Sequence, residues 1–327
     1  MERGSSRVRR RTGLAVALSV IATSGAAVGA WVVGGTDSQG ARPAAAVVSP
    51  SPSRLSPPPV QSDPLPSTSH LPSTEPEPSP SVSRRPSAGP TAAPTRRAKF
   101  DLASLPRPSV ESVYRGLPRA TKRPEAWRIA QPRERLTPAW AEPDPSRPPV
   151  LALERRTYGS PAAWLVTASS RGWVQVLVPL GRGALPSDDA SRVNRQSVWV
   201  ERSSVRVEPA RVRVVIDVSE RSLTVIDAGG GRVVIPAGVG VEGVTDTPRG
   251  VFAVAAHATA QVGEVVLLTA QSERLDGFYG TSYAATAIHV GPDVGRATSN
   301  GCVRLTADAF AEHAATLPVG TPVIVRG

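Results

Sequence analysis

Cysteine is nearly absent from this sequence: the 327 residues contain one, Cys302, and only four histidines. A single cysteine cannot form a disulfide within the chain, so a disulfide-stabilised fold is excluded. Cysteine and histidine metal sites need several ligands at close spacing, and no such cluster occurs in the sequence, so we predict no metal site. The lone cysteine is therefore a free thiol or the partner of a cysteine in another chain. As a free thiol it is either a small buried apolar residue or a reactive group.

The only long uncharged, mainly apolar run lies near the N-terminus. Five arginines among the first 11 residues precede an uncharged run from Thr12 to Thr36, which is near the roughly 20 residues that span a bilayer as a helix. We interpret residues 1–35 as an export signal. Its length favours a retained membrane anchor, while a small-residue stretch at Val28–Ala30 leaves cleavage open. The rest of the chain is expected to be extracytoplasmic, at the cell wall or facing it from the membrane.

Large apolar side chains are scarce in residues 36–98, which are dominated by Pro, Ser, Thr and Ala. Fifteen of the 34 prolines fall between Ala41 and Thr95. Such a segment buries too little apolar surface to offset the entropy of ordering, so we predict a disordered, semi-rigid linker.

Short runs of alternating apolar and polar residues characterise residues 99–208, and they are bounded by Gly, Pro, Ser and Asp. AAWLVTAS, GWVQVLVPL and SVWVERSSVRV are typical of antiparallel strands. We predict a small β barrel or sandwich from about Pro124 to Val207, with residues 99–123 left open as connecting chain. Trp164, Trp173 and Trp199 are expected to fill its core rather than to stack on sugars.

Residues 209–327 continue the strand pattern and contain one predicted helix. VRVVIDVS, RSLTVIDA, RVVIPAGVG, GVFAVAA and EVVLLTA predict five successive strands, with hairpins between the first three. Thr306 is the predicted N-cap of a helix through ADAFAEHAATL that ends before Pro318, and TPVIV predicts a last strand.

The net charge of +11 is concentrated upstream of the cysteine. Residues 99–204 carry 17 basic and 10 acidic side chains, whereas residues 205–327 carry 10 and 12. Nucleic acid is not an expected partner of an exported protein. The basic middle segment instead suits anionic wall polymers or lipid headgroups, or is simply a solvated arginine-rich surface.

Cys302 follows His289 by 13 positions, with Gly291, Pro292 and Gly295 in the loop between them. A nucleophilic cysteine requires a nearby base, usually histidine. A loop of this length can return the chain beside the strand that it left. Gly301 permits close backbone approach, so amides there are candidates for an oxyanion site. The spacing thus predicts a Cys–His pair at one site.

Three sequence blocks resemble those of the L,D-transpeptidases with the YkuD-type catalytic domain. SNGCVRL is similar to that family's [S/T]-H-G-C-[I/V]-R signature, AIHVG to its I-H-G block, and TDTPRGVF to its T-P-x-G-x-F segment. The export signal, linker and tryptophan-bearing region are similar to actinobacterial members with an SH3-like module. The implied fold class is mainly β: a small SH3-like β barrel followed by an L,D-transpeptidase-type β-rich catalytic domain with one late helix.

The resemblance implies roles for individual residues. Cys302 would be the nucleophile and His289 its general base, with the imidazole oriented by the Val290 carbonyl. The remaining site residues would form the oxyanion hole or shape the site: Ser299, Asn300, Gly301, Arg304 and Gly291. Thr247, Pro248 and Gly250 would be structural, and Tyr279 and Tyr283 are candidates to line the cleft or pack in the core. Asp293 is expected to be a solvated loop residue.

The implied reaction needs no cofactor. A peptidoglycan tetrapeptide would be the acyl donor and a side-chain amine the acceptor, giving a 3→3 cross-link. Two positions depart from the family pattern: Asn300 stands where a second histidine is usual, and Val290 replaces the glycine after His289. Three alternatives therefore remain: an L,D-carboxypeptidase with water as acceptor, a catalytically weak wall-binding module, and a structural tether between membrane and wall.

Overall fold

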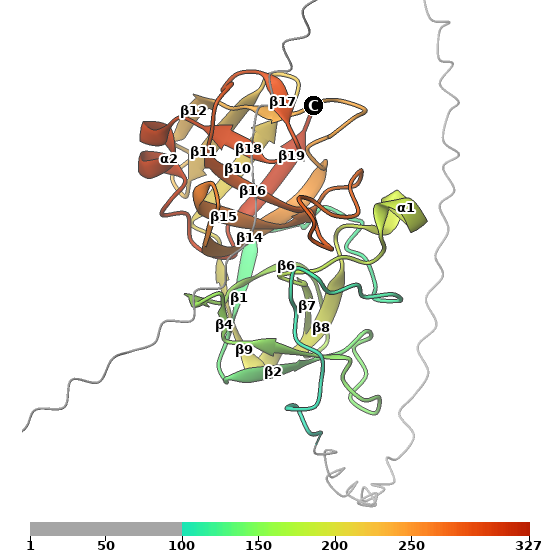
Figure 1. Ribbon diagram of the computed structural model, residues 1–327. Helices are drawn as coiled ribbons and strands as arrows, with labels where there is room; N and C mark the ends of the chain where they lie inside the picture. The colour runs from blue at the N-terminus through green and yellow to red at the C-terminus, as the bar shows by residue number, and fades with distance from the viewer. Residues whose placement is uncertain (1–99) are drawn as a thin grey trace, which may run out of the picture. The chain divides into compact units, whose positions relative to one another are not determined.

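A computed structural model describes residues 100–327. The expected export signal (residues 1–35), the linker (residues 36–98) and residue 99, the predicted start of the β domain, lie outside these residues. Within residues 100–327 no helix is long and apolar enough to cross a membrane. The described chain is mainly β with one late helix, as the sequence predicts (Figure 1).

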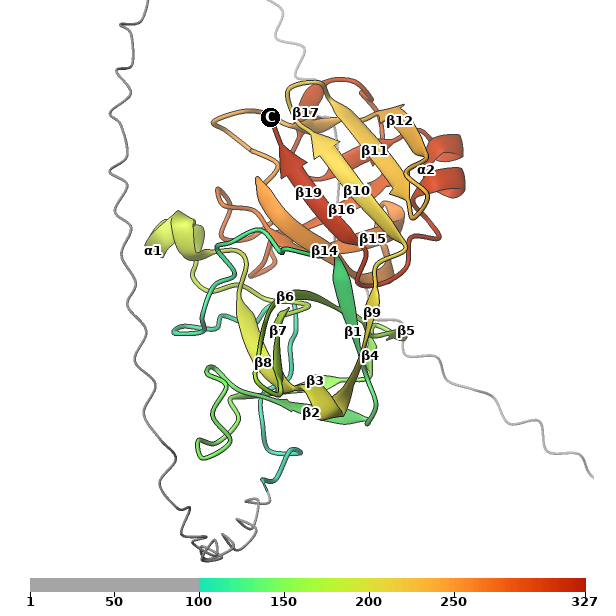
Figure 2. The same ribbon diagram turned by 180° about the vertical axis from the view of Figure 1, so that it is seen from behind.

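The first group of strands surrounds an apolar interior (Figure 2). Its five-stranded sheet has the order β8-β7-β6-β1-β9, with β1 (Arg128–Pro132), β6 (Trp164–Ser170), β7 (Trp173–Leu177), β8 (Ser197–Glu201) and β9 (Val205–Pro209). Two antiparallel pairs complete it: β2 (Leu136–Ala139) with β3 (Leu151–Glu154), and β4 (Arg156–Thr157) with β5 (Ser160–Pro161). Trp164 and Trp173 are buried, as expected of core tryptophans, and Trp199 is partly buried.

Residues 100–123 form no named strand, yet they are packed against the rest of the chain. Val113 and Arg119 make isolated bridges to Arg182 and Gln196. Both partners belong to the segment between β7 and β8, which also contains α1 (Pro186–Asp189) and the 3₁₀ turn η1 (Ala190–Arg192). A second 3₁₀ turn, η2 (Arg202–Ser204), follows β8.

The second group of strands is an eight-stranded sheet with the order β12-β11-β10-β19-β14-β15-β16-β18. Its members are β10 (Val212–Asp217), β11 (Ser222–Asp227), β12 (Arg232–Pro236), β14 (Gly250–Ala260), β15 (Gly263–Gln271), β16 (Ala285–Val290), β18 (Val303–Leu305) and β19 (Pro322–Arg326). The two predicted hairpins, β10 with β11 and β11 with β12, are present. The last strand, β19, lies between β10 and β14, parallel to the former and antiparallel to the latter.

A short parallel pair, β13 (Val239–Gly240) with β17 (Ala297–Ser299), leads the chain toward the cysteine. The predicted helix is α2 (Ala307–His313), and the Thr306 hydroxyl caps it by accepting a hydrogen bond from the Ala309 N–H at 3.3 Å. It ends four residues before Leu317, earlier than the apolar pattern suggested.

The two faces of strands β16 and β18 are buried differently. Ile288, Val303 and Leu305 point into the main core, where Phe310 of α2 also packs. Ala287 and Cys302 belong to another cluster, which includes Tyr283 and two upstream residues, Val110 and Leu180. The cysteine is therefore on the face opposite the helix, against residues that come from before the eight-stranded sheet.

Candidate active site

Strand register brings the cysteine and the histidine to one face of the sheet. Ile288 and Val303 are partners in the parallel pairing of β16 and β18, so Cys302, one residue earlier, stands opposite Ala287. Side chains alternate along strands, which puts Ala287, His289 and Cys302 on the same side. Residues 13 apart in sequence thus become neighbours on adjacent strands, as the loop between them suggested.

His289 has a defined tautomer. It is 2% exposed, and its Nδ1 lies 2.8 Å from the carbonyl oxygen of Val290. A carbonyl only accepts hydrogen bonds, so Nδ1 carries the proton and Nε2 keeps its lone pair. The ring is therefore held in the form that accepts a proton at Nε2, and the group that holds it is the Val290 carbonyl, as the family resemblance implies.

Burial keeps both groups uncharged. It lowers the pKa of His289, an effect that Arg304 reinforces and that the hydrogen bond to Val290 only partly offsets. Burial also raises the pKa of the Cys302 thiol, against smaller opposing effects of the Ala287 backbone and the Arg304 charge. At neutral pH the pair is a thiol and a neutral imidazole, so a base must remove the thiol proton when the substrate is bound.

Residues 299–302, which we call the cysteine turn, are fixed by Ser299, which is 1% exposed. Its hydroxyl donates to the Cys302 carbonyl at 2.6 Å and accepts from the Gly301 N–H at 3.2 Å. The predicted oxyanion role of the Gly301 amide therefore requires this second bond to break. Gly301 has φ +102°, and a Cβ there would lie 3.2 Å from the Asp246 carbonyl oxygen, so no other residue suits this position well.

The two departures from the family pattern lie at the surface. Asn300 is exposed, and Val290 is 37% exposed, so neither alters the buried pair directly. Gly291 is constrained instead, because a Cβ there would lie 2.9 Å from Cδ of Arg304.

Arg304 is a buried cation next to the pair, 7% exposed and opposite His289 in the strand register. Its backbone exchanges two hydrogen bonds with Gly238, at 2.8 and 2.9 Å. One guanidinium nitrogen lies 3.9 Å from Asp293, and Nε is buried without a hydrogen-bond partner among residues 100–327. The expectation of a merely solvated Asp293 is thus incomplete, since its carboxylate faces this guanidinium.

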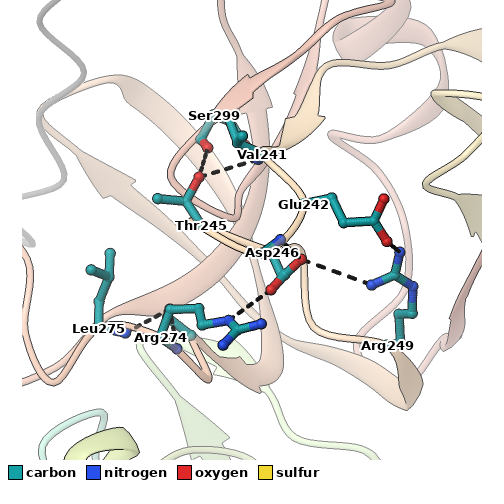
Figure 3. Close-up of polar contacts among 10 residues, drawn as sticks. Val241, Glu242, Thr245, Asp246, Arg249, Arg274, Leu275 and Ser299 are labelled. Atoms are coloured by element: carbon teal, nitrogen blue, oxygen red, sulfur yellow. Dashed lines mark hydrogen bonds and ion pairs between the residues drawn. The ribbon is translucent and has the colours of Figure 1, made fainter.

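A polar network supports the cysteine turn, and the sequence reasoning missed its two central residues (Figure 3). The Thr245 hydroxyl donates to the Ser299 carbonyl at 2.6 Å, and Asp246 accepts a hydrogen bond from Arg274 Nε at 2.7 Å. Thr247, which was expected to be structural, is 1% exposed and accepts from the Gly240 N–H at 2.9 Å. The signal for Thr245 and Asp246 was their place beside the T-P-x-G-x-F-like block, but no pattern indicated their partners.

The two tyrosines that were candidates to line the cleft or to pack in the core differ in burial. Tyr283 is buried in the cluster that contains Cys302, whereas Tyr279 is 45% exposed and packs edge-to-face on Phe278. Two further histidines contact other groups: His257 lies 2.8 Å from the Leu317 carbonyl, and His313 lies 3.6 Å from Glu312. No group of three or more potential metal-ligating side chains occurs in the described part of the chain.

Comparison with known proteins gives the family of this domain. Residues 211–325 match YkuD, the L,D-transpeptidase catalytic domain, and no curated protein matches the chain. Similar solved structures include an L,D-transpeptidase from Mycobacterium smegmatis, 20% identical over 47% of this chain and 91% of that one, TM-score 0.29. L,D-transpeptidase 3 from Mycobacterium tuberculosis is 16% identical over 47% and 92%, TM-score 0.32. An L,D-transpeptidase in complex with imipenem is 17% identical over 50% and 89%, TM-score 0.30.

The family match spans the strands that carry His289 and Cys302 and also the T-P-x-G-x-F-like block. It therefore covers all three sequence blocks on which the resemblance was based. Residues 211–325 form an L,D-transpeptidase catalytic domain of the YkuD family, and the chain is an L,D-transpeptidase, a transferase of peptidoglycan metabolism.

Proposed function

We propose that this enzyme forms 3→3 cross-links between peptidoglycan stem peptides through a thioester on Cys302. Nε2 of His289 takes the thiol proton as sulfur attacks the carbonyl carbon of the third residue of a tetrapeptide donor. The C–N bond to the terminal D-alanine breaks, and that amine leaves with the proton from His289. An acceptor side-chain amine then attacks the thioester and loses its proton to His289. The Cys302 thiolate leaves and takes that proton, which restores the thiol and the neutral imidazole.

One observation carries this proposal: an uncharged thiol and a neutral, base-competent imidazole share a face of adjacent parallel strands. The bond from His289 to Val290 supports general-base chemistry at Nε2. Arg304 would shape the site or meet a substrate carboxylate. Its position opposite His289 in the strand register supports this role, and so does its buried Nε, which has no hydrogen-bond partner among residues 100–327. Ser299 and Gly301 set the backbone that presents the thiol.

The remaining parts of the proposal concern the setting of the reaction. Residues 1–35 would export the protein and anchor it, residues 36–98 would act as a spacer, and residues 99–208 would be an SH3-like module. The basic middle domain would contact anionic wall polymers. Together these segments would hold the catalytic domain outside the cytoplasm, at its peptidoglycan substrate.

The first test is intact-mass spectrometry of the purified protein after incubation with imipenem, the carbapenem bound by one of the proteins compared above. We expect an adduct on Cys302 that is absent in Cys302→Ser and forms more slowly in His289→Ala. Absence of an adduct, under conditions that label another L,D-transpeptidase, would contradict the proposal and favour a wall-binding module.

The second test separates the two acyl acceptors. The protein is incubated with a disaccharide tetrapeptide, and the products are separated by mass. Cross-linked dimer with release of D-alanine supports transpeptidation, whereas tripeptide without any dimer identifies an L,D-carboxypeptidase.

A further inference from the structure

The segment between β15 and β16, residues 272–284, leads directly to the nucleophile. We refer to it as the 272–284 loop. It contains Tyr279 and the buried Tyr283, and it ends beside Ala285, whose carbonyl oxygen lies 3.8 Å from the Cys302 sulfur. The backbone of the loop is closed at its base by a 2.8 Å hydrogen bond from the Ser272 N–H to the Ala284 carbonyl. Its conformation therefore decides what surrounds the thiol.

Arg182, from the segment before the catalytic domain, is inserted into this loop. The side chain is 1% exposed, and one terminal nitrogen donates to the carbonyls of Asp276 and Ser282, both at 2.7 Å. Its other two guanidinium nitrogens have no hydrogen-bond partner among residues 100–327. Burying a guanidinium that is incompletely paired is costly, so its placement calls for a reason beyond packing.

Asn194 holds the start of the same loop. Its side-chain amide donates to the Gln271 carbonyl and accepts from the Gln271 N–H, both at 2.8 Å. This pairs it with the backbone as a neighbouring strand would. Asn194 also donates to Glu273 at 3.0 Å, and the Gln271 side chain donates to the Val110 carbonyl at 2.6 Å. Upstream residues thus hold both ends of the loop.

The 272–284 loop also contacts Asp246, which belongs to the polar network that supports the cysteine turn (Figure 3). Arg274 pairs with Asp246 at 2.7 Å, and the neighbouring Thr245 hydroxyl bonds to the Ser299 carbonyl. Ser299 bonds to the Cys302 carbonyl. Contacts therefore run without a break from the upstream domain through the loop to the backbone of the nucleophile.

We propose that Arg182 and Asn194 are positioning residues of the enzyme: the upstream domain supplies the side chains that hold the 272–284 loop over Cys302. On this view the catalytic domain is incomplete without the region before it. The inference rests on the proposed role of Cys302 as the nucleophile. It predicts that loosening the loop slows productive acylation while it opens the thiol to small reagents.

The test compares two reactions of Cys302 in full-length protein purified in detergent. One is acylation by imipenem, which requires the assembled site, and the other is alkylation by iodoacetamide, which requires only access to the thiol. For Arg182→Gln we expect acylation to slow by about 10- to 100-fold, the range typical of small misplacements in an active site. Alkylation should become severalfold faster, and Asn194→Ala should change both rates in the same directions.

Two control variants make the result specific. Arg206→Gln removes an arginine whose bonds, to Gln131 and Glu208, stay within the first group of strands, and it should alter neither rate. Arg182→Lys keeps the charge and a donor, and should recover part of the acylation rate.

Two results would overturn the inference. One is wild-type acylation by a folded Arg182→Gln variant. The other is a parallel fall in both rates that follows the folded fraction from circular dichroism, which would indicate a merely structural role. Because alkylation does not depend on transpeptidase chemistry, a wild-type protein that resists imipenem would refute the proposed function and still leave the loop tested by its alkylation rates.

Discussion

Ile288 and Val303 stand opposite each other in the parallel pairing of β16 and β18, and both side chains enter the main core with Phe310. Because side chains alternate, this apolar pair forces Ala287, His289 and Cys302 onto the other face. A register slip of one residue would turn the thiol into the core and Val303 out of it. The burial of two ordinary apolar residues thus fixes the relation of nucleophile and base.

Acylation of Cys302 should depend on pH through His289. Its ordinary pKa is 6.5, and burial lowers it in the folded protein, so the imidazole should stay neutral to below pH 6.5. Burial also raises the pKa of the thiol above its ordinary 9.0. We expect an acylation rate that changes little between these values and falls in acid, once the imidazole binds a proton.

The measurement is the imipenem acylation rate across pH 5 to 9, with the melting temperature recorded at each pH. Because the unfolded chain binds a proton more readily than folded His289, stability is also lost as the pH falls below 6.5. Rates must therefore be compared where the protein remains folded. An acid limb retained in His289→Ala would show that another group is responsible.

Ser299→Ala should weaken both the site and the fold. The substitution removes the acceptor of the buried Gly301 N–H and the donor to the Cys302 carbonyl. An unsatisfied buried amide costs about 1–3 kcal/mol, and the cysteine turn loses its internal support. Urea denaturation should show this loss, and acylation should slow. Ser204→Ala is the matched control, since that hydroxyl makes one bond, to the Glu201 carbonyl, far from the site in sequence.

Gly301→Ala should be more damaging than the same change at another glycine of positive φ. Gly301 has φ +102°, and an added Cβ would press on the Asp246 carbonyl oxygen at 3.2 Å. Gly172 has φ +77° and open space around the position of its Cβ. Backbone strain of about 1–2 kcal/mol is expected at both, whereas loss of acylation is expected only at Gly301. Equal acylation rates for the two variants would contradict the close approach at the cysteine turn.

Arg274→Gln and Arg249→Gln should separate function from stability. Both arginines pair with Asp246, Arg274 at 2.7 Å and Arg249 at 3.9 Å, and both are partly exposed. Solvent-exposed pairs contribute only about 0–1 kcal/mol, so neither variant should lose much stability. Arg274 belongs to the 272–284 loop, so its loss should slow acylation severalfold, while Arg249→Gln should leave the rate unchanged. Acylation rate constants compared at equal folded fraction distinguish a loss of function from a loss of stability.

Local sequence patterns predicted most of the strands and the late helix, because turns, caps and side-chain alternation depend on residues close together in sequence. Alternation and glycine turns indicated the strands β10, β11 and β12 with their hairpins, and Thr306 marked the start of α2 correctly. Its end was wrong by a few residues, since the chain after His313 packs apolar residues without continuing the helix. The position of β19 between β10 and β14 was not predictable, because this pairing joins segments more than 60 residues apart.

The sequence by itself determined which residues are candidates for chemistry: one cysteine, one histidine at a suitable spacing, and three blocks that define the family. These are properties of residue type and local order, which a chain displays before it folds. Only the tertiary structure decided that Ser299, Thr245 and Asp246 support the cysteine, and that Arg182 and Asn194 hold the loop beside it. Apart from the bonds of the Ser299 hydroxyl, which stay within the cysteine turn, these hydrogen bonds join residues far apart in sequence. Their formation depends on burial that no local pattern records.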